Sequence, residues 1–543
     1  MNLFKLIRLG LTAGVEFRSQ KNTGNNIKFF GLPNDYILGP VGYGGSSMTT
    51  TVTEDGNTLA LIFQPDFGIT TSHTFSAGEG DKYIFSPSLR PELNSAYGTK
   101  TKWVVNPGLA VRWNIDRENF MQRLKPWISS MNVRASWGRV VKYTASRYDV
   151  WGTYDVNPDN RYDNQAYIPI NFGKLPNANL EPITTTQWNL GGALGLFNGK
   201  VYVDFDTYYK QVDNQLSDVQ LPDHSGFTSV KSTEVSLVNY GLEMNFSVNP
   251  LPKKWKMKLN CGVNFAINKD FVTKLPNEAR QIINDRAGVV NRLGGNATSM
   301  FLYINKGVYA NDEDVPVNPA TGRRLRLGGV NNQEGYFKAG DPIWVDINGD
   351  YVIDERDKVI AGNSQPRIQG GGFINLTYGD LSVHTSFSMI FGRDIINANL
   401  AETFNTYTNP LLNESSLTGS GALAPISKYN FWTKENRENA TYPNPYDYTH
   451  ASQIKPFRPE QTLWMEDGSY FKINTISLSY RLPKRWLHFL RVRSVALKAS
   501  LNNVWTFSSY SGISPEKVSG LGYDTSGGYP SPRQWTMGVT IGF

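Results

Sequence analysis

With 543 residues, of which 13% are aromatic and only 19% charged, the chain has a composition that favours strands and turns over helices. Its net charge of +7 is scattered without a block of lysine and arginine, which excludes a nucleic-acid-binding arm. No run of 18 apolar residues occurs, which excludes a transmembrane helix, and the single cysteine, Cys261, excludes an intramolecular disulfide.

The N-terminal stretch, residues 1–8, has only a faint likeness to an export signal. Arg8 interrupts its apolar run, and the chain continues into Val15 and Phe17 without a small-residue cleavage site. We therefore interpret this stretch as strand sequence. We expect the chain to be a fragment, or a reading frame that begins inside a longer protein.

Apolar side chains then recur at every second position in about fourteen segments, the pattern of strands with one apolar face. Leu59, Leu61 and Phe63, for example, share one side of an extended chain. Cys261 stands on the apolar side of another segment, where we interpret it as a small hydrophobic residue. The predicted strands are 10–22, 58–76, 82–92, 100–117, 127–140, 183–197, 200–214, 236–249, 255–267, 366–378, 381–395, 467–482, 491–507 and 532–543.

One hairpin is predicted around Asn198 and Gly199, the dipeptide preferred in a two-residue type I′ turn. Such a turn brings Leu196 opposite Val201. The apolar residues of both strands then lie on the same side of the sheet, so the register is consistent with one apolar face.

The spacers between the predicted strands alternate between short turns and long loops. Residues 198–199, 250–254 and 379–380 are short, whereas 268–365 and 396–466 are very long. Short turns at one end of the strands and long loops at the other are typical of outer-membrane barrels. We therefore predict an all-β fold, an antiparallel transmembrane β-barrel with short periplasmic turns and long extracellular loops.

The last predicted strand ends on an aromatic residue. Trp535, Met537, Val539, Ile541 and Phe543 alternate with small and polar residues. This pattern resembles the C-terminal strand by which the barrel-assembly machinery recognises its outer-membrane substrates.

A series of motifs across residues 130–543 resembles the SusC/RagA-type TonB-dependent transporters of Bacteroidetes outer membranes. The motifs are 131–138 (MNVRASWG), 180–191 (LEPITTTQWNLG), 338–341 with 346–350 (KAGD and DINGD), 501–504 with 510–516 (LNNV and YSGISPE), and 529–533 (YPSPR). They occur in the order that the family shows, and residues 1–130 match it more loosely.

The resemblance implies a large plugged barrel, which in such transporters has about 22 strands. Because fewer strands are predicted here, it implies that residues 1–543 form the C-terminal barrel portion, without signal peptide, TonB box or plug domain. By the same resemblance, the intact relative lies in outer-membrane lipid and imports oligosaccharides or peptides. It is driven by TonB, which would act through the missing N-terminal plug region, and it is capped by a SusD-type surface lipoprotein.

The stretch 346–357 matches the ligand spacing of a calcium-binding loop. Clustered carboxylates repel one another without a cation, so we predict a structural Ca²⁺ that braces the loop 268–365. Tyr351 stands where glycine usually makes the turn and Asp357 is shorter than the usual glutamate, so an Asx-rich turn is the alternative. The predicted ligands are the side chains of Asp346, Asn348, Asp350, Asp354 and Asp357 and the carbonyl of Val352.

Motifs of enzymes are missing from the sequence. Its five histidines are dispersed, and no H-E-x-x-H motif, nucleophile elbow or P-loop occurs. The glycines 370–372 lie inside a predicted strand and not before a helix. We therefore expect no catalytic site.

Aromatic residues of the long loops could stack on sugar rings. The plainer interpretation is that the long loops pack on one another around these aromatics. The residues are Tyr303, Trp344, Phe404, Tyr407, Tyr429, Phe431 and Trp432.

Two alternatives to a transporter barrel stay open. A self-contained porin-like channel of about fourteen strands would conduct across a planar bilayer, and it requires segment 10–22 to pair with 532–543. A surface glycan-binding β-protein without a pore would dissolve without detergent, which the apolar strand faces argue against. Loop residues set the substrate, which the sequence does not identify.

Overall fold

The computed structural model describes residues 7–29, 47–70, 81–94, 103–143, 146–154, 161–162, 165–166, 170–252, 254–284, 289–328, 335–408, 425–483, 485–487, 492–524 and 530–542. The chain divides into two compact units. The first comprises Met1–Lys125, Ser130–Gly192 and Tyr208–Val238, and the second Pro126–Ser129, Ala193–Thr207 and Asn239–Phe543. The predicted strand sequence before Ile7, parts 71–76, 100–102 and 491 of three predicted strands, and the terminal Phe543 lie outside the described residues.

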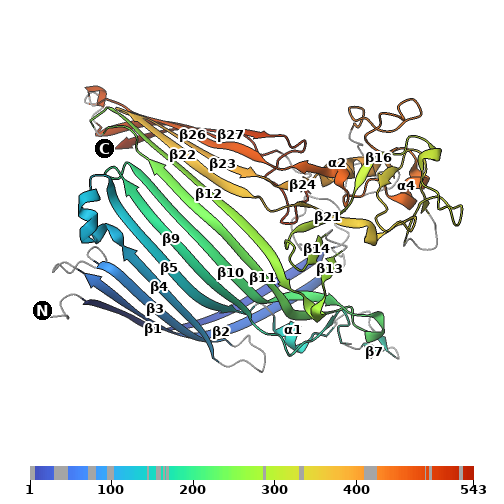
Figure 1. The fold of residues 1–543 in the computed structure, drawn as a ribbon, viewed down its shortest axis with the longest axis horizontal. Coiled ribbons are helices and arrows are strands. Elements are labelled where there is room, and N and C mark those ends of the chain that lie inside the picture. Colours follow the sequence, from blue (N-terminus) through green and yellow to red (C-terminus); the bar gives the residue numbers. More distant parts are fainter. Residues whose placement is uncertain are drawn as a thin grey trace. The chain divides into compact units, whose positions relative to one another are not determined.

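The long strands are hydrogen-bonded to their neighbours in chain order (Figure 1). In the first unit the order is β1-β2-β3-β4-β5-β9-β10-β11, and in the second it is β9-β10-β11-β12-β22-β23-β26-β27-β28. Neighbours are antiparallel from β1 to β5 and from β12 to β28. The bounds are β1 Ile7–Phe29, β2 Ser47–Thr70, β3 Asp81–Asn94, β4 Val104–Asn114, β5 Ile128–Lys142, β9 Ile183–Leu196, β10 Val201–Gln220, β11 Ser229–Val248, β12 Met257–Lys274, β22 Ile368–Tyr378, β23 Leu381–Phe391, β26 Tyr470–Arg481, β27 Ser494–Ser508 and β28 Gln534–Gly542.

Each predicted strand overlaps one of these long strands, so the alternation of apolar residues is confirmed as the signal for the sheet. The predicted loop 23–57 is too long, because β1 and β2 continue to pair as far as Phe29 and Ser47. A ladder uses backbone groups, so polar residues extend it without an apolar pattern that would reveal the extension.

The hairpin between β9 and β10 is confirmed with Asn198 and Gly199 in its turn, and Phe197 joins the turn as a further residue. Phe197, Asn198 and Gly199 all have positive φ, of 55°, 58° and 75°. The amide of Lys200 donates to the carbonyl of Phe197 at 3.4 Å, the bond of the predicted two-residue turn, and to the carbonyl of Leu196 at 3.0 Å, so Phe197 also takes part in the turn. Phe197 is held in this conformation because its amide donates to the carbonyl of Trp127 at 2.7 Å and its ring packs edge-on against the Trp127 ring.

In the first unit, apolar residues form a row across neighbouring strands. Leu9 is paired with Phe67, Phe67 with Phe85, Phe85 with Val111, and Val111 with Ala135. Leu9 is 66% exposed and Phe85 44% exposed, so this row is covered by no other part of the unit that the structure describes. A contiguous exposed apolar surface of this kind needs an apolar environment.

The opposite face of the same strands is polar. Arg8 lies between two carboxylates, with its Nη2 atom 3.0 Å from Asp66 Oδ2 and 2.7 Å from Asp81 Oδ2. Ser86 donates to the other carboxylate oxygen of Asp66. The sheet of this unit is therefore apolar on one face and carries ion pairs on the other, as the strand periodicity of two requires.

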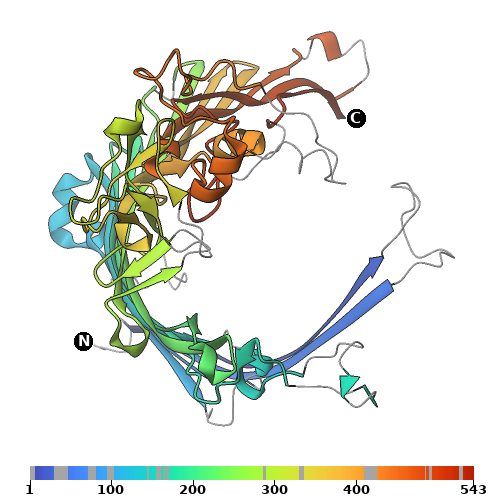
Figure 2. The ribbon, with the colours of Figure 1, turned by 90° about the vertical axis from the view of Figure 1, so that its right-hand side faces the viewer.

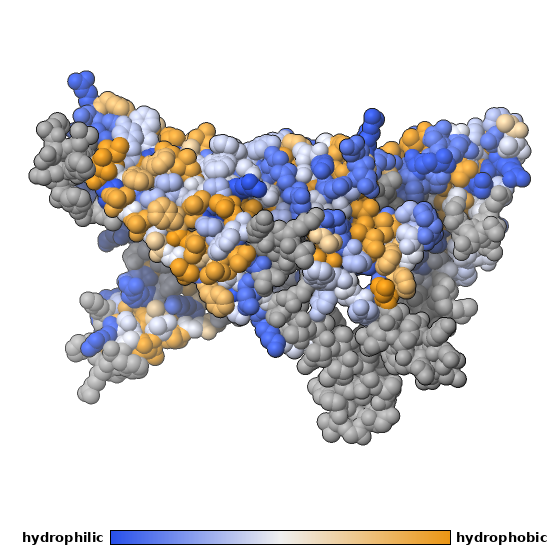
Figure 3. All heavy atoms as spheres, turned by 90° about the horizontal axis from the view of Figure 1, so that it is seen from below, coloured by the Kyte–Doolittle hydropathy of each residue, from blue (hydrophilic) through white to orange (hydrophobic). Residues whose placement is uncertain are grey.

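The second unit repeats this arrangement. Leu376 pairs with Leu259 on one side and with Val383 on the other, and Val383 pairs with Leu478. The row ends at Met537, which is 80% exposed. The space-filling view of one face of the molecule shows wide areas of exposed apolar side chains (Figure 3).

Three consecutive glycines, 370–372, lie inside β22, as predicted. A Cβ atom on Gly370 would overlap the carbonyl oxygen of Asn264 on β12, and one on Gly372 would overlap the carbonyl oxygen of Gly262. The backbones of β12 and β22 approach so closely here that a side chain does not fit between them.

At one end of the long strands of the second unit, short elements form what we call the loop body, the described residues of 276–363 and 394–467 (Figures 1 and 2). Among the residues described, no helix has the length and apolar character needed to cross a membrane. The remaining elements of the chain are α1 Arg147–Trp151, α2 Ala398–Asn405, α4 Tyr448–Ile454, η2 Ile115–Arg117, η3 Asn119–Leu124, η4 Asp223–Ser225, η5 Pro276–Glu278, η6 Asp312–Asp314, η7 Glu355–Asp357, η8 Thr406–Thr408, η9 Thr462–Trp464, β6 Arg161–Tyr162, β7 Gln165–Ala166, β8 Lys174–Leu175, β13 Gln281–Asn284, β14 Val289–Arg292, β15 Ser299–Tyr303, β16 Asn305–Val308, β17 Arg326–Leu327, β18 Gly335–Tyr336, β19 Pro342–Trp344, β20 Val352–Ile353, β21 Lys358–Asn363, β24 Asp394–Ile396 and β25 Met465–Asp467.

Candidate functional site

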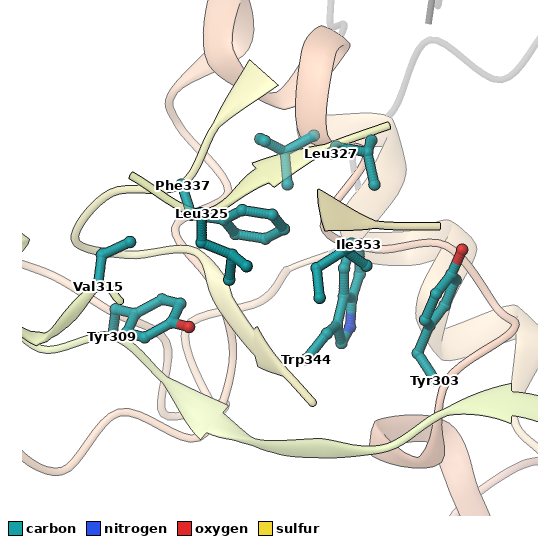
Figure 4. Close-up of a cluster of buried hydrophobic side chains, with 9 residues drawn as sticks. Tyr303, Tyr309, Val315, Leu325, Leu327, Phe337, Trp344 and Ile353 are labelled. Atoms are coloured by element: carbon teal, nitrogen blue, oxygen red, sulfur yellow. The ribbon is translucent and has the colours of Figure 1, made fainter. Parts of the chain in front are cut away.

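The loop body has two hydrophobic cores of its own. In the first, Phe337, Trp344 and Ile353 point toward one another, and Tyr303 stacks on Trp344 with ring centroids 5.1 Å apart (Figure 4). In the second, Phe404 of α2 is fully buried and stacks on Tyr442 at 4.8 Å. Each core draws residues from both very long loops, so the loops fold as one body.

The loop aromatics that sequence analysis singled out are packing residues. Tyr303, Trp344 and Phe404 are at most 2% exposed. Tyr407, Tyr429 and Phe431 pack against the second core, and Trp432 donates through Nε1 to the carbonyl of Ala310 at 3.2 Å. The plainer interpretation, in which the long loops pack around their own aromatics, is confirmed for these residues.

A buried glutamine that the sequence did not single out joins the two loops. The Oε1 atom of Gln461 accepts from Asn305 Nδ2 at 2.9 Å and from Trp344 Nε1 at 2.8 Å. Its Nε2 atom donates to the carbonyls of Pro456 at 2.8 Å and Arg458 at 3.0 Å. The buried side-chain amide of Gln461 thus makes all four of its hydrogen bonds, two as acceptor and two as donor. These bonds fix the backbone around Arg458.

A cavity of about 980 Å³ opens in the loop body beside α2 and α4. Asn397 caps α2 by accepting from the amide of Leu400, and Asp447 caps α4 by accepting from the amide of His450, which sets where each helix begins. The cavity is lined by Glu355, Lys358, Ala398, Asn399, Ala401, Glu402, Asn405, Thr406, Thr408, Ala451, Ser452, Lys455, Phe457, Arg458, Pro459 and Glu460. Its volume is that of a ligand-binding pocket, and its wall is rich in charged, amide and hydroxyl groups.

Two cations of the cavity wall, Arg458 and Lys358, lie over the ring of Tyr303. Arg458 lies over two rings, 5.4 Å from the centroid of Tyr303 and 4.9 Å from that of Trp344. Lys358 also lies over Tyr303, with its Nζ atom 5.1 Å from the ring centroid. The same Nζ atom forms an ion pair with Glu355 Oε2 at 2.6 Å. Burial raises the pKa of the Tyr303 phenol further above neutral pH, and the uncharged ring offers its π-face to both cations.

The KAGD motif, 338–341, connects the first long loop to α4. Asp341 accepts from the amide of Lys338 at 2.8 Å and lies 2.6 Å from Nε2 of His450. Lys338 in turn pairs with Asp447 at 2.5 Å. Burial raises the pKa of the Asp341 carboxyl, although the contact with His450 acts against this rise. The motif therefore links the first long loop to α4 of the second through two ion pairs.

The predicted calcium segment is a loop closed by Asx turns. Asp346 accepts from the amides of Gly349 at 2.7 Å and Tyr351 at 2.8 Å, and Asn348 accepts from the amide of Asp350 at 2.8 Å. Tyr351 has a φ of 63°, the left-handed conformation for which glycine is usual. The sharp turn of a calcium loop is thus made without its glycine.

The other predicted ligands are also engaged within the protein. Arg356 Nη2 lies 2.8 Å from Asp350 Oδ2 and 2.7 Å from Asp354 Oδ2, and its hydrogen bond lowers the pKa of Asp354. Asp357 is buried and accepts from the amides of Ile347 at 2.9 Å and Asp354 at 2.8 Å. Arg356 therefore supplies positive charge to two carboxylates that we expected a calcium ion to neutralise. Among the residues described, no three or more acidic, histidine or cysteine side chains are placed to hold a metal ion.

Calcium binding to residues 346–357 stays a prediction, and a thermal test decides it. If Ca²⁺ binds, calcium added to metal-free protein should raise the temperature at which the loop body melts, since a ligand of the folded state stabilises it. Asp346→Asn removes a predicted ligand charge and should abolish the rise, while Asp312→Asn, on an exposed turn outside the segment, should leave it intact. The same melting temperature with calcium and with a chelator would contradict the prediction.

Comparison with known proteins gives a consistent result for the whole chain. Residues 2–504 match the family described as TonB dependent receptor-like, beta-barrel. TonB-dependent receptor P3 of Formosa agariphila is 26% identical over 98% of this chain and 54% of its own length. TonB-dependent receptor SusC of Bacteroides thetaiotaomicron is 23% identical over 85% of this chain and 42% of its own length.

Among solved structures, the RagAB peptide transporter superposes with a TM-score of 0.75 at 18% sequence identity. The superposition covers 100% of this chain and 54% of that chain. The chain thus spans about half the length of the curated relatives and of the solved structure that it matches. At this identity, the likeness to the solved structure is a likeness of fold.

Proposed function

Because the chain belongs to the TonB-dependent receptor-like β-barrel family, an outer-membrane family of receptors and transporters, we propose that it acts in nutrient import of the SusC/RagA type. In this proposal its strands supply barrel wall in the outer membrane, and its loop body faces the cell exterior. The imported substrate is an oligosaccharide or a peptide.

The observation that carries the proposal is the two-sided sheet joined to a folded loop body. The apolar rows suit lipid on one face, while the ion pairs of the other face suit a hydrated interior. The loop body adds a cavity with the size and polarity of a ligand site. A lipid-facing wall and a polar binding cavity are what an importer requires.

The assignment of the lipid face has a direct test in the first unit. Phe85→Arg is expected to destabilise the protein in phospholipid vesicles by about 2–4 kcal/mol, because it places a charge in the hydrocarbon region. Phe120→Arg is the matched control, since Phe120 is exposed on η3, outside the strands. Urea unfolding measures both variants, and equal stability of the two would contradict a lipid-facing Phe85.

A SusD-type surface lipoprotein and TonB are the partners in this proposal, with TonB acting through a plug region. Their support is the similarity to SusC and to the RagAB structure. A tagged copy of the chain, solubilised from native outer membranes with mild detergent, should bring a surface lipoprotein with it. Recovery of the chain free of any lipoprotein would remove this part of the proposal.

The import function is tested in the native bacterium. A strain that lacks the chain should fail to take up a substrate from a panel of labelled oligosaccharides and oligopeptides, and the restored gene should return uptake. Collapse of the proton gradient should stop that uptake in the wild type. Unchanged uptake of every member of the panel would overturn the proposal.

A further inference from the structure

From the geometry of the loop-body cavity we infer that it binds a ligand through a carboxylate, and that Arg458 is the group that receives it. The inference rests on the proposed import function and specifies the ligand chemistry of that site. A short peptide with a free C-terminus and an oligosaccharide of uronic acids both offer this group.

Arg458 is held in place before any ligand arrives. Its Nη2 and Nε atoms donate to the carbonyls of Ile454 at 3.3 Å and Lys455 at 3.4 Å, at the end of α4. Its guanidinium plane lies over the Tyr303 and Trp344 rings. An arginine fixed in this way loses little side-chain entropy on binding, and a planar guanidinium matches a carboxylate in two parallel hydrogen bonds.

The charge of Arg458 is also not matched by an acid. No carboxylate in the part of the chain that the structure describes lies within 4.0 Å of its guanidinium, whereas the neighbouring Lys358 is paired with Glu355. The residue lines the cavity and is partly exposed there. A fixed, partly desolvated cation without its own counter-ion favours a ligand that brings one.

The rest of the wall fits a charged polar ligand better than a neutral sugar. The wall carries three cations, Lys358, Lys455 and Arg458, and Asn399, Asn405 and Thr408 offer amide and hydroxyl groups. It also carries three acids, Glu355, Glu402 and Glu460, of which Glu355 is paired with Lys358. The aromatic residue of the lining, Phe457, is 1% exposed and therefore presents no face on which a sugar ring could stack.

The experiment compares ligands that differ only in the carboxylate. Isothermal titration of the intact protein in detergent micelles uses tetra-alanine against its C-terminal amide, and trigalacturonate against its methyl ester. At least one free acid should bind about tenfold or more tightly than its neutral partner, the effect of a charge-assisted pair. The acid that shows the difference identifies the source of the carboxylate.

Variants then assign the effect to Arg458. Arg458→Met keeps the stem over the rings and removes the charge, so it should weaken the bound acid about tenfold and abolish the preference over its neutral partner. Arg458→Lys should keep part of the preference. Lys434→Met, at an exposed lysine of the same loop that does not line the cavity, should bind like the wild type.

Several results would overturn the inference. They are equal affinity for acid and neutral partner, a preference that survives in Arg458→Met, or no binding of either acid by protein whose loop body resists protease. The failure of the import proposal looks different, since a strain without the chain would then take up nutrients normally while the purified protein still preferred the acid.

Discussion

Phe404→Ala is expected to unfold the loop body locally while the long strands persist. Phe404 is fully buried, and its ring lies 5.3 Å from Phe457 and 5.8 Å from Trp464 in addition to the stack on Tyr442. Removing a buried phenylalanine costs about 3–5 kcal/mol, and the lost aromatic pairs lie within this cost.

Limited proteolysis of intact cells measures this effect, because an unfolded loop body exposes cleavage sites in residues 425–467. The strands should still migrate as a compact, heat-modifiable species on gels. Tyr448→Ala is the matched control, since Tyr448 is 47% exposed on α4, and it should leave the protease pattern unchanged. Identical patterns for the two variants would show that the second core does not hold the loops together.

Gly370→Ala is expected to act on the sheet instead of the loops. The added methyl would overlap the carbonyl oxygen of Asn264 and approach the Cα atom of Phe265 to 2.9 Å, so β12 and β22 would have to separate. Both obstacles are backbone atoms, which do not rotate away. Overpacking of this kind costs about 1–3 kcal/mol and more where the backbone must move.

Gly538→Ala provides the same substitution without the obstacle. Gly538 lies in β28 of the same unit, and a Cβ atom there meets nothing within 4 Å. It should be neutral or slightly stabilising, because alanine reduces the freedom of the unfolded chain. The urea midpoint and the yield of heat-modifiable protein compare the two variants. Equal midpoints would mean that the strands at Gly370 can move apart at little cost.

The long strands could be predicted because their signal is local. Leu59, Leu61 and Phe63 reveal their shared face by spacing alone, and the lipid-type pattern needs no knowledge of the partner strand. What the pattern missed were extensions such as the pairing of Ile27 with Thr49, which depends on backbone hydrogen bonds. The part of Phe197 in the turn was missed for a similar reason, since Trp127, which holds it, is 70 residues away in the sequence.

The candidate site could not be predicted because its parts meet only in the fold. Gln461 bonds to Trp344 across 117 residues, and no periodicity marks either residue as part of a cavity. The motif that did attract attention, 346–357, gave a true turn signal, but spacing alone did not reveal that Arg356 would bind its carboxylates. Arg458 carries no motif, and its position follows from α4 and the two rings beneath it.

The division of each core between two loops limits how the loop body can be altered. In the first core Ile454 of the second loop joins Tyr303 and Trp344 of the first. In the second core Met300 and Leu302 of the first loop pack with Phe404 and Trp464 of the second. Neither loop can be exchanged with that of a relative without leaving apolar side chains of its counterpart uncovered. Substitutions on the cavity wall, or replacement of both loops together as one segment, avoid this loss of packing.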